Sequence, residues 1–107
     1  MITYLVAADL DSTTGSRRRL RDRSKTLFGN ADRLEVAFAV AQSSGVVHAQ
    51  ELSDQLSISP PRVRTQLLAF CAAGLMEALP RTELKQYYER LDDPFWVAVA
   101  LVTESWR

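Results

Sequence analysis

The sequence contains one cysteine and one histidine in 107 residues, and its four glycines are scattered along the chain. Because Cys71 is alone, the chain can form no internal disulfide and offers no cysteine cluster to zinc. His48 has no second histidine or cysteine as a partner, so we expect it to cap or pack a helix. A glycine-rich phosphate loop is also missing. The sequence therefore predicts no metal, no cofactor and no catalytic residue, and so not an enzyme.

Long hydrophobic runs are absent as well. The longest, residues 95–102, is far shorter than the ~20 residues that a membrane-spanning helix needs. The first residues lack the charged lead and the apolar stretch of a secretory signal. We therefore expect a soluble protein in a reducing, cytoplasmic setting, without a membrane partner.

The chain has no excess of charge, with 13 basic and 13 acidic side chains, but the basic ones are unevenly placed. A dense basic cluster lies between Arg17 and Lys25. Any polyanion would therefore meet a local patch and not a global field. The cluster is typical of a solvated helix or arm, and the alternative is an arm that lies near a polyanion.

The length favours one main domain. Residues 11–15, D-S-T-T-G, predict a turn after an apolar start of ambiguous type. We divide the chain into an N-terminal apolar segment with a basic helix or arm, residues 1–27, and a main domain, residues 28–107. Asn30 is expected to cap a broadly apolar helix that ends near residue 42 and lies in the middle of the core.

The stretch from Ser59 to Gly74 has clear helix boundaries. Ser59 is a good cap, Pro60 suits the first helical position, and Gly74 suits a left-handed ending. An apolar stripe, Val63, Leu67 and Phe70, predicts a buried back. The other side carries long hydrogen-bond donors and small residues, and the whole stretch lacks an acidic side chain. Such a face favours contact with the major groove of DNA, although an ordinary solvated surface helix has the same pattern.

The neighbouring segments complete a familiar arrangement. Residues 48–56 predict a short helix, and a four-residue link, residues 57–60, joins it to the acid-free helix, which is a helix-turn-helix pattern. Residues 75–79 and 86–91 favour two strands around a basic tip, a hairpin of the kind called a wing. The predicted fold class is mainly α with a small two-stranded β-wing, and helices flank the helix-turn-helix at both ends.

The last helix, residues 95–106, is apolar around nearly its whole circumference. Such a helix must be buried on more than one side, and a chain of this size has little else to cover it. We expect a second copy of the protein as the cover, across a two-fold axis. The predicted interface residues share the apolar stripes of this helix: Phe95, Trp96, Val99, Val102 and Trp106.

Together these elements resemble the winged helix-turn-helix transcriptional regulators of the arsenic-repressor (ArsR-like) type. The resemblance covers about residues 28–96 and finds no counterpart for the first thirty residues. Each piece is degenerate, but their order and spacing are specific for the fold. The segments that carry it are F-G-N-A-D-R-L-E-V (28–36), A-Q-E-L-S-D-Q-L-S-I-S (49–59), V-R-T-Q-L-L (63–68), A-A-G-L-M-E (72–77) and Q-Y-Y-E-R-L (86–91).

This resemblance implies a site on double-stranded DNA. In the family the helix that begins near Ser59 enters the major groove, while the wing contacts the adjacent minor groove or backbone. Family dimers pair mainly through terminal helices. Metal-sensing members carry cysteine pairs or histidine ligands that this sequence lacks. The positions that match DNA contacts are Ser59, Pro61, Arg62, Arg64, Thr65 and, more weakly, Gln66 on the helix, with Arg81 and Lys85 on the wing.

Two hypotheses for function follow. The first is a sequence-specific DNA-binding protein, a homodimeric repressor that occupies a pseudo-palindromic site and blocks polymerase. The second is a winged-helix module that contacts other proteins without binding DNA. Zero net charge favours the second, whereas the acid-free helix and the basic wing tip favour the first. The sequence identifies neither the operator nor a small-molecule effector.

Overall fold

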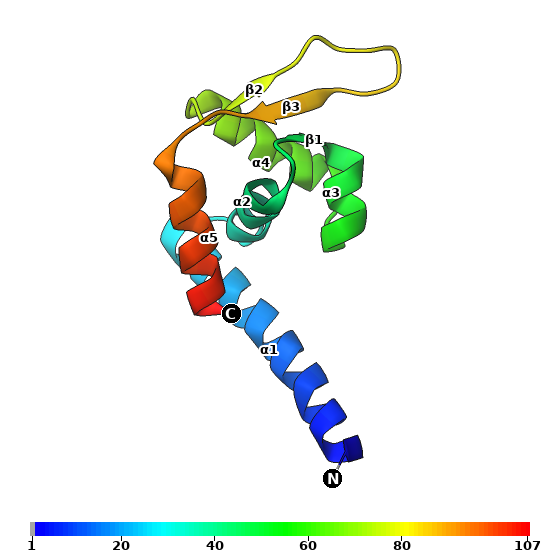
Figure 1. Ribbon diagram of the computed structural model, residues 1–107, viewed down its shortest axis with the longest axis vertical. Helices are drawn as coiled ribbons and strands as arrows, with labels where there is room; N and C mark the ends of the chain where they lie inside the picture. The colour runs from blue at the N-terminus through cyan, green and yellow to red at the C-terminus, as the bar shows by residue number, and fades with distance from the viewer. Residues whose placement is uncertain (1) are drawn as a thin grey trace.

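The computed structural model describes the backbone of residues 2–107 and the side chains of residues 15–107. Five helices and three short strands make up this range, and the strands form one antiparallel sheet of order β1-β3-β2 (Figure 1). The elements are α1 (Ile2–Phe28), α2 (Arg33–Gln42), β1 (Val46–His48), α3 (Ala49–Leu56), α4 (Pro60–Ala72), β2 (Met76–Ala78), β3 (Tyr87–Arg90) and α5 (Pro94–Trp106). The predicted fold class, mainly α with a small β-wing, is confirmed.

Helix α1 is continuous from Ile2 to Phe28, so the turn expected at residues 11–15 is wrong. Its second half is fastened to the body by a buried leucine, Leu20, and by Ser24. The Ser24 hydroxyl donates to the carbonyl of Asn30 over 2.6 Å and accepts from the amide of Leu34 over 3.1 Å. The first half extends away from the other elements (Figure 1).

Helix α2 lies at the centre of the molecule, and α5 packs beside it. Leu34, Val36, Ala37 and Val40 are almost completely buried, as the broad apolar stripe predicts. The helix starts later than expected, because Asp32 occupies the position before its first residue. The expectation that Asn30 caps this helix is therefore wrong, and its side chain instead accepts the amide of Asp32 over 2.8 Å.

The sheet has one strand more than the wing predicted from the sequence. β2 and β3 form the wing, and β1 pairs antiparallel with the other edge of β3, with Val47 opposite Tyr88 and His48 opposite Tyr87. The alternation of β-strand side chains places Val47 and Tyr88 in the core. This third strand connects the wing to the start of α3.

Helix α5 presents to the core the residues that we expected at a dimer interface. Trp96 and Val99 are buried within the same chain, and Phe95 packs against that core. Trp96 contacts Phe70 of α4 edge to face, with ring centroids 5.5 Å apart. Two members of the predicted interface, Trp96 and Val99, are therefore core residues, and the large apolar side chains that α5 exposes are Val97 and Leu101, at 65% and 68% exposure.

The two remaining members of the predicted interface, Val102 and Trp106, are half-buried. Trp106 lies beneath the guanidinium of Arg23 on α1, 5.0 Å from the ring centroid. The end of α5 is thus covered in part by α1 of the same chain. No helix within residues 2–107 combines the length and hydropathy needed to cross a membrane.

Candidate nucleic-acid interface

Helix α4 begins and ends where the sequence predicts. The backbone of Ser59 starts it, with its carbonyl accepting the amide of Val63 over 3.0 Å, although the Ser59 side chain makes no capping bond. At the other end Gly74, at φ +78°, adopts the left-handed conformation. The amides of Gly74 and Leu75 donate to the carbonyls of Cys71 and Phe70, which is the Schellman ending that glycine favours.

The outer face of α4 carries most of the predicted DNA-contacting residues. Val63, Leu67 and Phe70 are buried, as their spacing predicts, and this fixes the rotation of the helix. Ser59, Pro61, Arg62, Arg64 and Thr65 are exposed, and the Thr65 hydroxyl donates to the carbonyl of Pro61 over 3.0 Å. α4 contains no carboxylate, so its outer face has no negative side chain of its own to repel a phosphate.

Gln66 does not lie on this outer face. The sequence analysis placed it there, but its side chain is only 1% exposed. Its Oε1 accepts a hydrogen bond of 3.0 Å from Nε of Arg33 on α2. Gln66 therefore links α4 to α2 and is withdrawn as a DNA contact.

Arg62, one of the positions that match DNA contacts, is exposed, but its guanidinium is already paired within the chain. Its Nε and Nη2 donate to the two carboxylate oxygens of Asp32, over 2.9 and 2.6 Å. This paired geometry is the strong form of an arginine–carboxylate contact. Arg62 can still present Nη1 to a phosphate, because that nitrogen lies outside the pair.

The Asp32–Arg62 pair belongs to a larger arginine–carboxylate network. Arg21 of α1 donates to Asp32 over 2.8 Å and to Glu35 over 2.6 Å, and Arg17 donates to Glu35 over 2.8 Å. The two carboxylates are largely buried, whereas the arginines are more exposed. Two residues of the basic cluster, Arg17 and Arg21, thus pair inward with buried carboxylates, so the interpretation of the cluster as a purely solvated arm is incomplete.

Protonation in this network follows from its geometry. Burial by itself would raise the pKa of Asp32, but hydrogen bonds from Arg62 and Arg21, with their positive charges, outweigh it and lower the pKa below its ordinary value. The hydrogen bond from Asp32 in turn raises the pKa of Arg62. The Asp32–Arg62 pair therefore stays charged over the physiological range, and the network joins α1, α2 and α4.

The wing brings two further predicted residues to the same side of the molecule as the start of α4. Arg81 and Lys85 are both exposed, in the loop between β2 and β3. Thr82 closes the tip of this loop, because its hydroxyl donates to the carbonyl of Lys85 over 2.9 Å and accepts its amide over 3.1 Å. Arg64, Arg81 and Lys85 line one open hollow of about 560 Å³.

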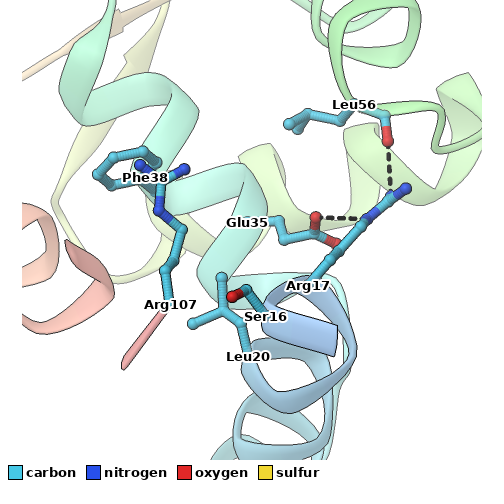
Figure 2. Close-up of a pocket in the computed structure, with 7 residues that line it drawn as sticks. All are labelled: Ser16, Arg17, Leu20, Glu35, Phe38, Leu56 and Arg107. Atoms are coloured by element: carbon cyan, nitrogen blue, oxygen red, sulfur yellow. Dashed lines mark hydrogen bonds and ion pairs between the residues drawn. The ribbon is translucent and has the colours of Figure 1, made fainter. Parts of the chain in front are cut away.

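A second hollow lies beside the network, between α1, α2, the end of α3 and Arg107 (Figure 2). It encloses about 380 Å³, and Leu20, Phe38 and Leu56 form much of its wall. Arg17 spans its edge, since Nη2 donates to the carbonyl of Leu56 over 2.7 Å while Nε holds Glu35 (Figure 2).

The described side chains offer no metal centre. Among residues 15–107 no three histidine, cysteine, aspartate or glutamate side chains are grouped so that they could hold a metal ion. Cys71 is half-buried on α4, and its burial raises the pKa of the thiol, which disfavours the reactive thiolate.

Comparison with known proteins gives a consistent result at the level of the fold. No protein-family model matches the chain, and no curated protein sequence matches it. Among solved structures it is similar to the reduced form of MarR from E. coli, with a TM-score of 0.62 and 16% identity over 95% of this chain and 74% of that one.

Two further solved structures extend this comparison. MepR, a transcription regulator of the Staphylococcus aureus multidrug efflux pump MepA, has a TM-score of 0.59 and 9% identity over 98% of this chain and 75% of that one. A cysteine-to-serine mutant of E. coli MarR complexed with operator DNA has a TM-score of 0.58 and 16% identity, over 97% of this chain and 74% of that one.

These matches extend beyond the ArsR-like resemblance. Coverage of 95–98% of the chain must include most of α1, for which that resemblance found no counterpart. The identities are too low to assign a family, and the ArsR-like type in particular is not supported. The chain therefore has the winged helix-turn-helix fold that these MarR and MepR structures share.

Proposed function

We propose that this protein is a sequence-specific DNA-binding regulator of transcription. The observation that carries the proposal is the position of the acid-free outer face of α4 beside the basic wing. Arg64, Arg81 and Lys85 line one hollow whose wall contains no carboxylate side chain. A groove-reading helix and a basic strand hairpin on one side of a protein match the major groove and the neighbouring backbone of DNA. The operator complex of the MarR mutant supports this use of the fold.

Arg64 is assigned to base recognition and Lys85 to the phosphate backbone. Arg64 leaves α4 one turn after its start, at the flank of the buried Val63 and Leu67 stripe, and a paired contact to guanine is worth ~1–3 kcal/mol of discrimination. Ser59, Pro61 and Thr65 flank it on the same exposed surface.

We expect Arg64→Ala to lower affinity for the cognate site by roughly 10-fold or more and to flatten the protein's preference for that site over random DNA.

Lys85→Ala should weaken binding to cognate and random DNA about equally and reduce the slope of the salt dependence by roughly one unit. Thermal stability should barely change, because both side chains are exposed. Fluorescence-anisotropy titrations at several salt concentrations test this, and equal selectivity in the Arg64 variant and wild type would remove Arg64 from the interface.

The proposal includes a homodimer that represses by occupying a pseudo-palindromic site. Two features of the chain support a second copy as partner. Val97 and Leu101 expose an apolar strip on α5, and the first half of α1 extends from the body (Figure 1). A solitary helix of this kind gains little stability in water without packing. In a dimer with a two-fold axis, one interface can bury the α5 strip and the extended half of α1 of both protomers.

Leu101→Glu is therefore expected to convert the dimer to monomer, since it places a charge in the proposed apolar interface. Leu84→Glu is the matched control, because it makes the same chemical change at an even more exposed leucine on the wing. Sedimentation equilibrium at micromolar concentration distinguishes the two variants. A wild-type monomer, or a Leu101→Glu protein that remains dimeric, rules out this interface.

A further inference from the structure

The hollow beside the wing contains a residue that the DNA-binding assignment does not use. Its wall is formed by the start of α3, by Arg64 of α4 and by the loop between β2 and β3. His48, the single histidine of the chain, contributes to this wall together with Arg81 and Lys85. The hollow is thus lined by side chains that donate hydrogen bonds, from three separate parts of the fold.

Three contacts fix the position of the His48 ring. Its backbone pairs with Tyr87 in the sheet, in the register of β1 and β3. Its Nδ1 accepts the amide of Glu51 over 3.2 Å and so caps α3. The ring also meets Tyr87 edge to face, with the centroids 5.3 Å apart and the planes at 84°. This fixed ring brings Nε2 within 3.4 Å of Nζ of Lys85.

The cap determines which nitrogen of the imidazole carries the proton. A neutral imidazole has one nitrogen with a lone pair, and the other bears a hydrogen. Because Nδ1 uses its lone pair to accept from Glu51, Nε2 must bear the hydrogen and act as a donor. The Lys85 ammonium also has only donors. Two donors therefore approach each other over 3.4 Å, and a shared acceptor would satisfy both.

We propose that His48 and Lys85 hold a phosphate oxygen between them, and that Arg81 supplies additional positive charge to this phosphate site. A phosphate group has the negative charge and the several acceptor atoms that these donors require. On the proposed function, the occupant is a phosphodiester of the DNA backbone, so His48 positions the protein without reading sequence. Free inorganic phosphate has the same chemistry and is the other source to be distinguished.

His48→Asn is the informative variant. Asparagine is a good helix cap and can still accept the Glu51 amide, but it is too short to place a donor beside Lys85. We expect thermal stability close to that of wild type and affinity for both cognate and random duplex DNA reduced roughly tenfold. His48→Ala removes the cap as well, so it should lose thermal stability in addition to affinity.

A double-mutant cycle tests whether the two side chains share one acceptor. If they do, His48→Asn combined with Lys85→Ala should lose less affinity than the product of the two single losses. Strict additivity of the two effects means separate contacts and overturns the shared site. The shared site is also overturned if the His48→Asn protein binds random DNA as tightly as wild type does.

The single histidine also gives a direct readout, because its imidazole NMR signals belong to one residue. We expect these signals to shift when a duplex oligonucleotide is added, and inorganic phosphate to produce a smaller shift in the same direction. A shift with phosphate but no binding of DNA keeps the phosphate site and rejects the proposed function. DNA binding without any His48 shift keeps the proposed function and rejects this site.

Discussion

Replacing Trp96 with alanine is expected to lower the free energy of unfolding by about 3–5 kcal/mol. Trp96 is 5% exposed and contacts two aromatic rings edge to face, Phe70 at 5.5 Å and Phe95 at 5.0 Å between centroids. Its Nε1 also donates to the carbonyl of Leu75 over 3.3 Å. Removal leaves a cavity where α4, α5 and the start of β2 meet, and the Leu75 carbonyl keeps only its bond from the amide of Leu91.

An exposed leucine on the wing provides the control for this experiment. Leu84 is 88% exposed and lies outside the proposed dimer interface, so Leu84→Ala should change the unfolding free energy by no more than about 0.5 kcal/mol. Urea unfolding of both variants, with oligomeric state measured alongside, separates a core residue from an interface residue. If Trp96→Ala gives a monomer whose unfolding free energy matches that of wild type, Trp96 belongs to the interface and the placement of α5 is wrong.

Asp32→Asn is expected to destabilise the fold by about 2–3 kcal/mol, because it removes the charge that Arg21 and Arg62 share. The loss is smaller than for a fully buried pair, since the Arg62 side chain is 54% exposed and solvent can replace part of its contact. The same change releases Arg62 from its pair. We therefore expect affinity for random DNA to rise while stability falls.

Asp22→Asn is the matched control, because Asp22 is exposed on α1 and its replacement adds the same net charge. Both variants gain general attraction to DNA, but only Asp32→Asn also frees an arginine on α4. Chemical unfolding and anisotropy titrations distinguish them. Equal stability and equal DNA affinity in the two variants would show that the Asp32 pair has no special role.

The pH dependence of the Asp32 contribution has a defined sign. The pKa of Asp32 is lowered in the folded protein relative to its ordinary value of 3.8. Its stabilisation is therefore fully present above that ordinary pKa and is lost as pH falls through the folded pKa. Between neutral pH and about pH 4, wild type should keep its advantage over Asp32→Asn, and below that the difference should shrink.

The sequence predicts the elements that depend on local signals. Ser59, Pro60 and Gly74 mark the limits of α4, and the spacing of Val63 and Phe70 identifies its buried side. These are short-range effects of capping and helical period. The same reasoning fails at residues 11–15, where the helix continues through residues that usually favour a turn.

The features that the sequence does not predict depend on distant partners. Gln66 is buried against Arg33 of α2, and Arg62 is paired with Asp32. Asp32 lies 30 positions earlier in the chain, so short-range sequence signals do not reveal the pair. The sequence does not predict which side of α5 the chain itself buries, for a different reason. Its apolar residues surround the helix, so no periodic contrast distinguishes Trp96 from Val97, and only the packing against α2 and α4 decides.

The salt dependence of DNA binding by the wild-type protein tests the central claim most directly. If the outer face of α4 and the wing contact phosphates, the logarithm of the binding constant should fall steeply and linearly with the logarithm of salt concentration. The double variant Arg62→Ala, Arg64→Ala should bind more weakly and with a shallower slope. Absent or salt-independent binding by wild type, or undiminished binding by the double variant, would contradict the DNA-binding account and favour a protein partner for this surface.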